Sequence, residues 1–543
     1  MIQARLTRYL TTENRKKWKD NFKLFVKFYI LLTAIRYCIW AFRIGREQSK
    51  WERQHPEPPD YSWRSKWWYR TARGKANPDD NALVPWLEVG DTLKKLIARL
   101  EDPEIDGHEI IPRLGEGEEL YVDGIGKTGL DITAKSETWR RGYYEALMGA
   151  AVAGEHLDTW VRDRTRNTAF PPDVVIGPSN PRPKPVTYRS KKAPKEEDCE
   201  PAFDEPQIYY IRILTTEGFS SRQRLNAALA YADFLQYKGL LSSASDMYDW
   251  ALDIAVSNAP KDIIDKKSGI ITDGATGITE NVILAASALA MHKAQTGDLP
   301  GALPIYLSVL RARRSLPSAD PTVFTKSTPF RKPSTTWYGK INDYFLPPPY
   351  PEAPPTGDEP ATHTPTASCS EAATMAHIGE ILYASSSSDT RSTSHNSPIA
   401  TKAQEAGLAW TRDAFDLAES TVQSMSHTDP GLSVTGGPNA NRIHLQDPVA
   451  EQDAKTRCVE CLAMAIGNWK AMLRPLRKME RERKDQPVEQ KHKSSWNWLW
   501  SSSSTAESTD ESGKWEMEEM IVVAREQELQ KLLRREGIRM KEF

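Results

Sequence analysis

The chain has 543 residues, with 72 Lys and Arg against 73 Asp and Glu and a formal net charge of −1 at pH 7. Charges balanced this evenly argue against a nucleic-acid-binding protein and against a site that gathers acidic substrates. Its 37 prolines and several Ser/Thr-rich tracts predict long segments that cannot bury enough apolar surface to fold, so the length overstates the number of domains.

Residues 1–23 form a basic leader in which seven Lys and Arg accompany two acids. A basic, Thr-containing leader with few acids resembles a mitochondrial targeting segment. The leader therefore suggests a mitochondrial protein.

Residues 24–45, LFVKFYILLTAIRYCIWAFRIG, are long enough to cross about 30 Å of hydrocarbon as one helix. Arg36 near the middle costs about 2.5–3.5 kcal/mol. Lys27 and Arg36 fall on opposite sides of such a helix, which leaves no single polar face for the alternative, an interfacial helix. We expect one membrane span of undetermined orientation, anchored by apolar side chains that offset much of the cost of Arg36: Ile30, Leu31, Leu32, Ile35, Ile39, Trp40 and Phe42.

The segment that follows the span, DYSWRSKWWYR at 60–70, interleaves aromatic residues with cations. Beside a membrane helix this pattern predicts an aromatic belt at the interface. The start of a packed core helix explains it equally well, and both interpretations stay open.

Two windows of the sequence align without gaps, Gly239 to Leu252 with Gly297 to Leu310. An Ala-rich helical pattern precedes each window, and the spacing resembles that of the tetratricopeptide repeat. In that helix–turn–helix unit, glycine supplies the turn and small residues let the paired helices approach. The packing positions expected from the two windows and the helices before them are Ala232, Gly239, Ala244, Tyr248 and Ala251, then Ala290, Gly297, Ala302, Tyr306 and Val309.

Two looser units follow. Gly379 occupies the Leu-Gly position of one, and its second helix would place Ala406 and Trp410 against the first. Gly467 occupies the same position in the other, with a partner helix at 515–537. Because a repeat cannot bury its own apolar face, at least three units must stack, and the count just reaches that number.

Helical patterns upstream, at 85–100 and 136–164, would cap or extend the stack. The segments expected along the chain are a basic leader 1–23, a transmembrane helix 24–45, a juxtamembrane linker 46–84, an N-terminal helical region 85–165, a Pro-rich linker 166–206, repeats 207–317, a Pro/Thr-rich linker 318–370, a helical repeat with a Ser-rich insertion 371–425, a linker 426–452, a helix 453–480, a disordered insertion 481–514 and a C-terminal helix 515–543.

Motifs that carry chemistry are scarce. The ten histidines stand singly, outside any H-E-x-x-H pattern, and the sequence contains neither a G-x-S-x-G elbow nor a kinase motif set. His156 and His377 lie in helical patterns, where a structural role is the ordinary interpretation. We therefore expect no enzyme, no small-molecule substrate and no cofactor.

The five cysteines are too few and too scattered to predict a disulfide framework. Cys458 and Cys461 form a C-x-x-C inside an apolar helical run, where a spacing of three puts both side chains on one face. Zinc would need two further ligands that the sequence does not supply. We expect packing residues, with redox use as the alternative, and no metal site.

The stretch YVDGIGKTGL at 121–130 resembles a phosphate-binding loop at first sight. A Walker A loop, however, needs a glycine at position 121, where Tyr121 stands. A dinucleotide fingerprint needs a βαβ unit opening at the glycines. We interpret the stretch as a turn-rich loop that leads into a helix beginning near Ser136, which leaves a nucleotide-dependent enzyme as a minor alternative.

The order of leader, span, interrupted repeats and charged C-terminal helix resembles the fungal tetratricopeptide adaptor subunits of the mitochondrial inner-membrane i-AAA protease. The resemblance is one of layout, and at the residue level it is confined to the repeat positions named above. It implies a matrix-facing amino terminus, a repeat domain in the intermembrane space and delivery of unfolded substrates to the protease.

These observations predict an all-α fold, a short tetratricopeptide-like solenoid with long disordered insertions behind one N-terminal transmembrane helix. The expected function is that of a non-enzymatic adaptor that binds a protease subunit or unfolded client proteins. An assembly scaffold for another inner-membrane complex is the alternative.

Overall fold

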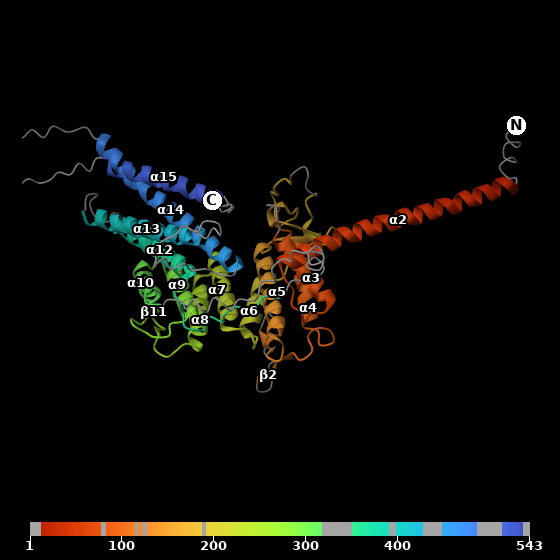
Figure 1. Cartoon of the computed structure of the whole chain (residues 1–543), viewed down its shortest axis with the longest axis horizontal. Helices are drawn as coiled ribbons and strands as arrows, with labels where there is room; N and C mark the ends of the chain where they lie inside the picture. The colour runs from red at the N-terminus through yellow and green to blue at the C-terminus, as the bar shows by residue number, and fades with distance from the viewer. Residues whose placement is uncertain are drawn as a thin grey trace, which may run out of the picture. The chain divides into compact units, whose positions relative to one another are not determined.

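The computed structural model describes residues 12–77, 83–112, 114–115, 118–119, 121–122, 126–127, 129–186, 192–317, 350–389, 398–426, 448–485 and 513–535. Contacts divide the chain into two compact units. Unit 1 comprises Met1–Phe219 with Lys332–Ala353, and unit 2 comprises Ser220–Arg331 with Pro354–Phe543. The described part is mostly helical, and its strands are only two or three residues long (Figure 1).

Unit 1 begins with α2 (Thr12–Gln54), a single uninterrupted helix (Figure 1). Four helices follow it, and each packs on the next along the chain from α2 through α6. They are α3 (Trp63–Ala76), α4 (Trp86–Leu100), α5 (Glu137–His156) and α6 (Pro206–Thr215).

Helix α5 is the centre of unit 1. The Ser136 hydroxyl caps its first turn by accepting from the Trp139 amide, and the Asp60 carboxylate holds that hydroxyl at 2.5 Å. One side of this helix is buried, with Tyr143, Leu147, Ala150 and Ala151 inaccessible to solvent. The helical region predicted at 85–165 thus supplies the core of this unit.

The Pro-rich stretch 166–206, predicted to be a linker, contains ordered secondary structure. Strand β7 (Val161–Asp163) pairs antiparallel with β8 (Thr168–Phe170) on one side and with β9 (Cys199–Pro201) on the other. Two 3-10 turns, η1 (Pro172–Val174) and η2 (Glu196–Asp198), lie between β8 and β9. Proline fixes φ without preventing turns and strand ends, so the composition was a poor guide to disorder here.

Short antiparallel pairs also occupy the region from 111 to 131. They are β1 (Ile111–Pro112) with β6 (Leu130–Asp131), β2 (Leu114–Gly115) with β3 (Glu118–Glu119), and β4 (Tyr121–Val122) with β5 (Gly126–Lys127). Within the predicted loop 121–130, two residues thus pair with two others, while residues 123–125 and 128 lie outside the described part. Gly126 lies in β5 and Gly129 precedes β6, so neither opens a helix, the feature that a phosphate-binding loop requires.

Unit 2 is a succession of helical hairpins. The pairs are α7 (Ser221–Tyr237) with α8 (Leu241–Ser257), α9 (Glu280–Gln295) with α10 (Leu299–Arg314), α12 (Pro365–Asp389) with α13 (Pro398–Ser426), and α14 (Pro448–Asp485) with α15 (Lys514–Arg535). The second helix of each of the first three hairpins also packs on the first helix of the next one. A small hairpin of β10 (Ile264–Asp265) and β11 (Ile270–Ile271) joins α8 to α9.

A disulfide between Cys369 of α12 and Cys458 of α14 crosses the core of the last two hairpins. The prediction that Cys458 is a mere packing residue is therefore wrong, because its partner lies 89 residues away and not in the C-x-x-C. Cys461 stays a free, buried thiol, and burial raises its pKa to about 12. Distance along the chain hid this pair from the sequence reasoning.

Candidate peptide-binding site

The turns of the first two hairpins of unit 2 depend on glycine. Gly239 and Gly297 have φ of +79° and +92°, and each stands between helices separated by only three residues. A Cβ at either position would meet nothing within 4 Å, so the requirement is for the left-handed backbone and not for space.

The small residues predicted to line these hairpins are buried where the helices meet. Their exposed fractions are at most 3%, and they comprise Ala232, Ala244, Tyr248 and Ala251 with Ala290, Ala302, Tyr306 and Val309. Close approach of the paired helices follows from side chains this small.

The two repeat tyrosines make the same contact with the next hairpin. Tyr248 of α8 lies against His292 of α9, with ring centroids 4.6 Å apart, and Tyr306 of α10 stacks on His377 of α12 at 5.6 Å. The Gln236 amide oxygen contacts His292 Nδ1 at 2.7 Å, and burial lowers the pKa of this histidine. Each tyrosine is thus a wedge between successive hairpins, and both histidines are structural.

In the third hairpin, Gly379 permits direct backbone contact with α13. A Cβ there would stand 2.7 Å from the Gly407 carbonyl oxygen and 2.6 Å from Thr411 Oγ1. The sequence placed Ala406 and Trp410 at this contact, but Ala406 is exposed and Trp410 is only half-buried. The packing residues of α13 are the next ones along the chain, because α13 turns Gly407 and Thr411 toward α12.

The packing role predicted for Gly467 is wrong. This residue lies on an exposed side of α14, and a Cβ would meet nothing within 4 Å. Its neighbours Ala465 and Trp469 are buried in the core. The Leu-Gly pattern therefore assigned a packing role to a residue on the exposed face of the helix.

The first two hairpins also bind an extended piece of their own chain, residues 356–361. Asn281, the second residue of α9, is completely buried. Its backbone amide donates to the Gly357 carbonyl at 3.2 Å, and its side-chain amide donates to the Thr356 carbonyl at 3.0 Å. Further along, the Ala361 amide donates to the Ile278 carbonyl at 2.8 Å. These hydrogen bonds are all made to backbone groups of the segment.

One side chain of this segment is recognised as well. The Asp358 carboxylate accepts from Asn281 Nδ2 at 2.8 Å and from Asn258 Nδ2 at 2.9 Å. Arg222 Nη1 donates to Asn281 Oδ1 at 3.3 Å, which orients the amide. We call Arg222, Asn258 and Asn281 the amide clamp.

The conformation of the bound segment fits the clamp closely. Gly357 has φ of +76°, and a Cβ there would stand 2.3 Å from Asn281 Oδ1. Although burial raises the pKa of Glu359, hydrogen bonds from Thr356 and Gly357 outweigh it and leave that pKa below its usual value. The segment is a pre-shaped turn followed by an extended strand.

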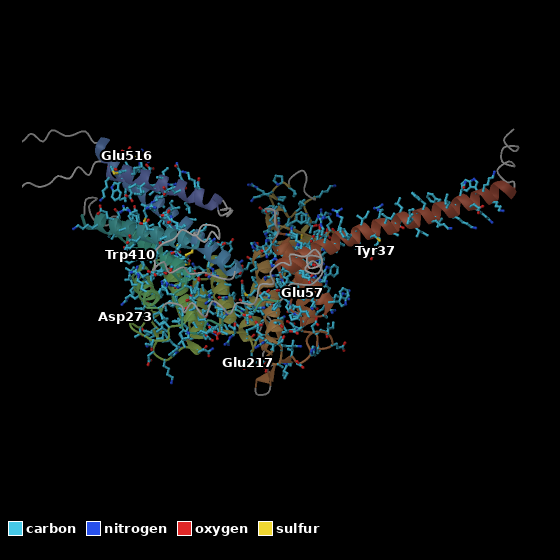
Figure 2. The ribbon with its side chains drawn as sticks, viewed as in Figure 1. Tyr37, Glu57, Glu217, Asp273, Trp410 and Glu516 are labelled. Atoms are coloured by element: carbon cyan, nitrogen blue, oxygen red, sulfur yellow. A yellow bond between two sulfur atoms is a disulfide. The ribbon has the colours of Figure 1, made fainter. Side chains whose placement is uncertain are left out.

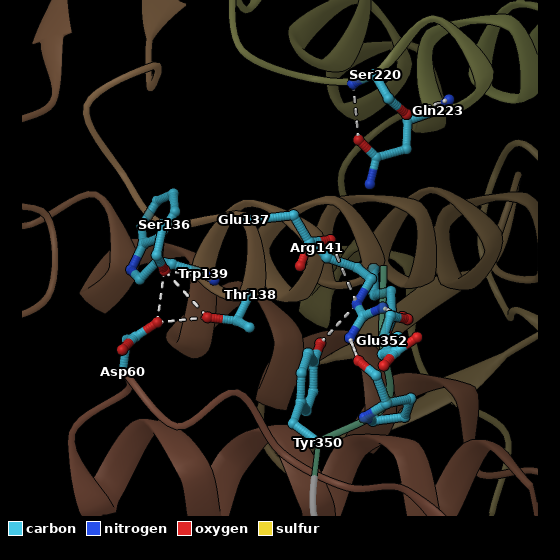
Figure 3. Close-up of polar contacts among 12 residues, drawn as sticks. Asp60, Ser136, Glu137, Thr138, Trp139, Arg141, Ser220, Gln223, Tyr350 and Glu352 are labelled. Atoms are coloured by element: carbon cyan, nitrogen blue, oxygen red, sulfur yellow. Dashed lines mark hydrogen bonds and ion pairs between the residues drawn. The ribbon is translucent and has the colours of Figure 1, made fainter. Parts of the chain in front are cut away.

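Unit 1 holds the preceding residues 350–352 through a single arginine of α5 (Figure 3). Arg141 Nη1 and Nη2 donate to the Glu352 and Pro351 carbonyls at 2.7 and 2.6 Å, and its Nε donates to the Tyr350 hydroxyl at 3.1 Å. The guanidinium also lies 4.2 Å from the centre of the Tyr350 ring. Arginine suits this role because its fork donates several bonds at once.

The described residues include no group of three or more His, Cys, Asp or Glu arranged to hold a metal ion. His156 stacks on Trp86 at 4.1 Å, and burial lowers its pKa. The chemistry that the described site offers is hydrogen bonding to extended peptide.

The predicted anchor residues all lie on α2 with their side chains exposed, as Figure 2 shows around the labelled Tyr37. Their exposed fractions are 43% or more, for Ile30, Leu31, Leu32, Ile35, Ile39, Trp40 and Phe42. By length and composition alone, the stretch Lys16–Glu52 is apolar enough to cross a membrane.

The chain matches no family model, no curated protein and no solved structure.

Sequence reasoning missed both sites that hold the segment. A Pro/Thr-rich stretch was interpreted as a linker at 318–370, whereas residues 350–364 make ordered contacts and α12 already begins at Pro365. The available signals were the turn sequence Thr-Gly-Asp at 356–358 and a polar Asn281 at the start of an apolar helix. Two other Pro- or Trp-rich stretches, 427–441 and 494–504, lie outside the described residues.

Proposed function

We propose that the chain is a membrane-anchored adaptor whose tetratricopeptide-type hairpin stack binds extended segments of protein partners or unfolded clients. The observation that carries the proposal is the amide clamp. There the stack holds an extended segment of its own chain, and Asn281 contacts the backbone carbonyls of Thr356 and Gly357. Backbone recognition of this kind is what an adaptor for unfolded chains requires.

The repeat-like contacts support the tetratricopeptide assignment. Helix hairpins with a glycine turn, buried small residues and an aromatic wedge recur at matching positions in the first two hairpins. Stacking of such units creates extended surfaces for binding polypeptides. The long connections between the later helices are compatible with insertions into such an array.

The proposed location is the mitochondrial inner membrane, where the chain would act as an adaptor for the i-AAA protease. The basic leader and the apolar stretch of α2 favour this placement. Because structural disulfides persist in oxidising compartments and are rare where thiols are kept reduced, the Cys369–Cys458 bond favours the intermembrane space for unit 2.

Site-specific photocrosslinking in isolated mitochondria tests the adaptor function. The full chain would carry a photoreactive residue in place of Trp250 of α8, which is 39% exposed. The matched control places the probe at Trp160 of unit 1, which is 37% exposed. We expect protease subunits or client chains among the products of the first probe only. Recovery of neither class would overturn the proposal.

A second candidate, an assembly scaffold for another inner-membrane complex, is favoured by an apolar stripe on α15. Met517, Met520, Ile521 and Val523 are 42–63% exposed, which is typical of a surface that a permanent partner covers. A scaffold predicts stable co-migration with one complex on native gels, and normal client turnover after deletion of the gene. An adaptor predicts slowed turnover.

A further inference from the structure

We propose that α3 is an interfacial helix, which seats Trp63 and Trp67 with neighbouring cations in the headgroup layer of the bilayer. The partner is the lipid surface itself. This inference rests on the proposed span of α2, and it adds a second, peripheral contact between unit 1 and the membrane.

The contact between α2 and the rest of unit 1 begins where the apolar span ends. Side chains of α2 from Lys16 to Arg43 are exposed, and Ile44 is the first that is half-buried. Gln48 Nε2 then donates to Thr71 Oγ1 of α3 at 3.2 Å. One turn further, the Trp51 ring lies so close to Gly74 that a Cβ there would stand 2.5 Å from it. Unit 1 therefore meets α2 directly at the expected membrane surface.

The same contacts fix the level at which α3 meets α2. Thr71 pairs with Gln48, Gly74 with Trp51 and Arg70 with Glu52, so α3 touches α2 from residue 70 onward, just beyond the end of the span. Trp67 and Trp63 lie one and two turns before Thr71 on α3. At about 1.5 Å per residue they are within about 6 and 12 Å of Thr71 along the helix, while Gln48 is about 4.5 Å beyond the end of the span.

The contact between Gln48 and Thr71 lies within the headgroup region. A bilayer of about 40–45 Å with a core of about 30 Å leaves roughly 5–7 Å of headgroup region on each side. Tryptophan concentrates at this depth because its ring is apolar and its N–H can donate to polar groups.

The face of α3 is divided as an interfacial helix requires. Ser65, Tyr69 and Ala72 are 0–2% exposed and pack into unit 1. On the other face Trp63 is 74% and Trp67 is 40% exposed, one turn apart. The packed core helix expected for the segment 60–70 thus corresponds to one face of α3, and the aromatic belt corresponds to the other face.

Cations accompany the two exposed tryptophans. Arg64 is exposed, and Lys66 is half-buried with the Glu57 and Asp60 carboxylates within electrostatic range. Trp68, in contrast, is held by protein, with the Arg64 and Arg99 guanidinium groups 5.9 and 5.6 Å from its ring. Cations at this level favour anionic headgroups.

Crosslinking to photoactivatable phospholipids tests the proposal on the full chain reconstituted in nanodiscs. One lipid carries its diazirine next to the headgroup, and another carries it at the acyl end. We expect the headgroup probe to label Trp63 and Trp67, and the acyl-end probe to label only residues 30–42 of α2. Trp160 and Trp250 are internal controls of similar exposure to Trp67, and neither probe should label them.

Labelling of α2 without labelling of Trp63 or Trp67 would overturn the inference and leave the span intact. Absence of label on α2 would overturn the span and this inference together. Neither result bears on client crosslinks from Trp250, so the proposed adaptor activity is tested separately.

Two variants sharpen the test. Trp63→Ser with Trp67→Ser should abolish headgroup labelling of the 63–67 peptide, whereas Trp250→Ser should change nothing. Arg64→Gln with Lys66→Gln should remove the increase in labelling expected on passing from zwitterionic to anionic lipid. Equal labelling of the unmodified chain in both lipids would overturn the role of the cations.

Discussion

The two units stabilise their cores by different means. In unit 1, buried tyrosine hydroxyls donate to carboxylates from other elements, as Tyr143 does to Glu101 at 2.7 Å and Tyr210 to Glu155 at 2.6 Å. Arg212 donates to the same Glu101 at 2.8 Å. In unit 2, Tyr248 also donates to a carboxylate, that of Asp233, but small side chains and aromatic wedges bring successive hairpins together. A core of linked polar pairs tolerates few changes at each pair, whereas a stack tolerates many but depends on its points of closest approach.

We expect the largest difference in stability between the two units after reduction of the Cys369–Cys458 disulfide. A cross-link between residues this far apart stabilises by about 2–4 kcal/mol. Reductant should speed amide hydrogen exchange in α12 and α14 and leave α4 and α5 unchanged, as followed by mass spectrometry. Cys461→Ser is the control, since it leaves the bond intact. Equal effects in both units would contradict the assignment.

Loss of the Arg141 contacts in unit 1 should have the next largest effect. Arg141→Ala removes three hydrogen bonds from a charged donor, and we expect a loss of about 3 kcal/mol in urea unfolding. Arg141→Lys should recover less than half of it, because an ammonium cannot reproduce the fork. Arg311→Ala in unit 2 removes an exposed ion pair with Asp273 and a long bond to the Leu307 carbonyl of the same helix, and should cost less than about 1 kcal/mol. A loss as large for Arg311 as for Arg141 would refute this reasoning.

Two glycines matched to the same repeat position should respond with opposite signs. Gly379→Ala forces α12 away from α13 and should destabilise by about 1–3 kcal/mol. Gly467→Ala adds a methyl group in open space inside a helix and should stabilise by up to about 1 kcal/mol. Thermal unfolding of both variants is the measurement. A cost for Gly467→Ala would mean that this face of α14 is covered.

The smallest effect concerns the turn between β7 and β8. The Thr165 hydroxyl donates to the Asp163 carboxylate at 2.6 Å, and Arg166 and the Thr165 amide add to it, which lowers the pKa of Asp163 to about 2. In the unfolded chain this pKa is about 3.9. The group therefore stabilises the folded state above pH about 4, and this contribution is lost as the pH falls toward about 2.

Asp163→Asn tests this turn. The variant should be less stable than the unmodified chain at pH 7, and the difference should shrink between pH about 4 and about 2. Urea titrations at several pH values provide the measurement. A difference that is independent of pH would show that the charge of Asp163 does not contribute.

The sequence predicted the stack of unit 2 better than the architecture of unit 1, for a physical reason. A repeat uses the same spacing more than once. Alignment of the two windows therefore identifies Gly239 with Gly297 and Tyr248 with Tyr306 as equivalent positions. The contacts of unit 1 occur once each and join residues far apart, such as Arg212 and Glu101 at a separation of 111 residues. The local sequence around either residue does not indicate that the two residues pair.

The candidate site was the least predictable part. Asn281 and Arg141 act on residues 350–358, and only folding brings these partners together. Proline-rich composition was interpreted as disorder, yet proline fixes φ and lowers the entropic cost of holding an extended segment. The match of Gly467 failed because a motif does not state which face of a helix is covered.

The disulfide also changes how the chain would respond to mechanical force. Cys369 and Cys458 close a covalent ring, and the 89-residue separation corresponds to about 300 Å of extended chain. Tension applied between the two termini passes through the sulfur–sulfur bond and bypasses that length. Under load α13 lies inside the ring, shielded from direct pulling, and a motor that drew the chain through a narrow pore would have to admit the two arms of the ring beside the rest of the chain.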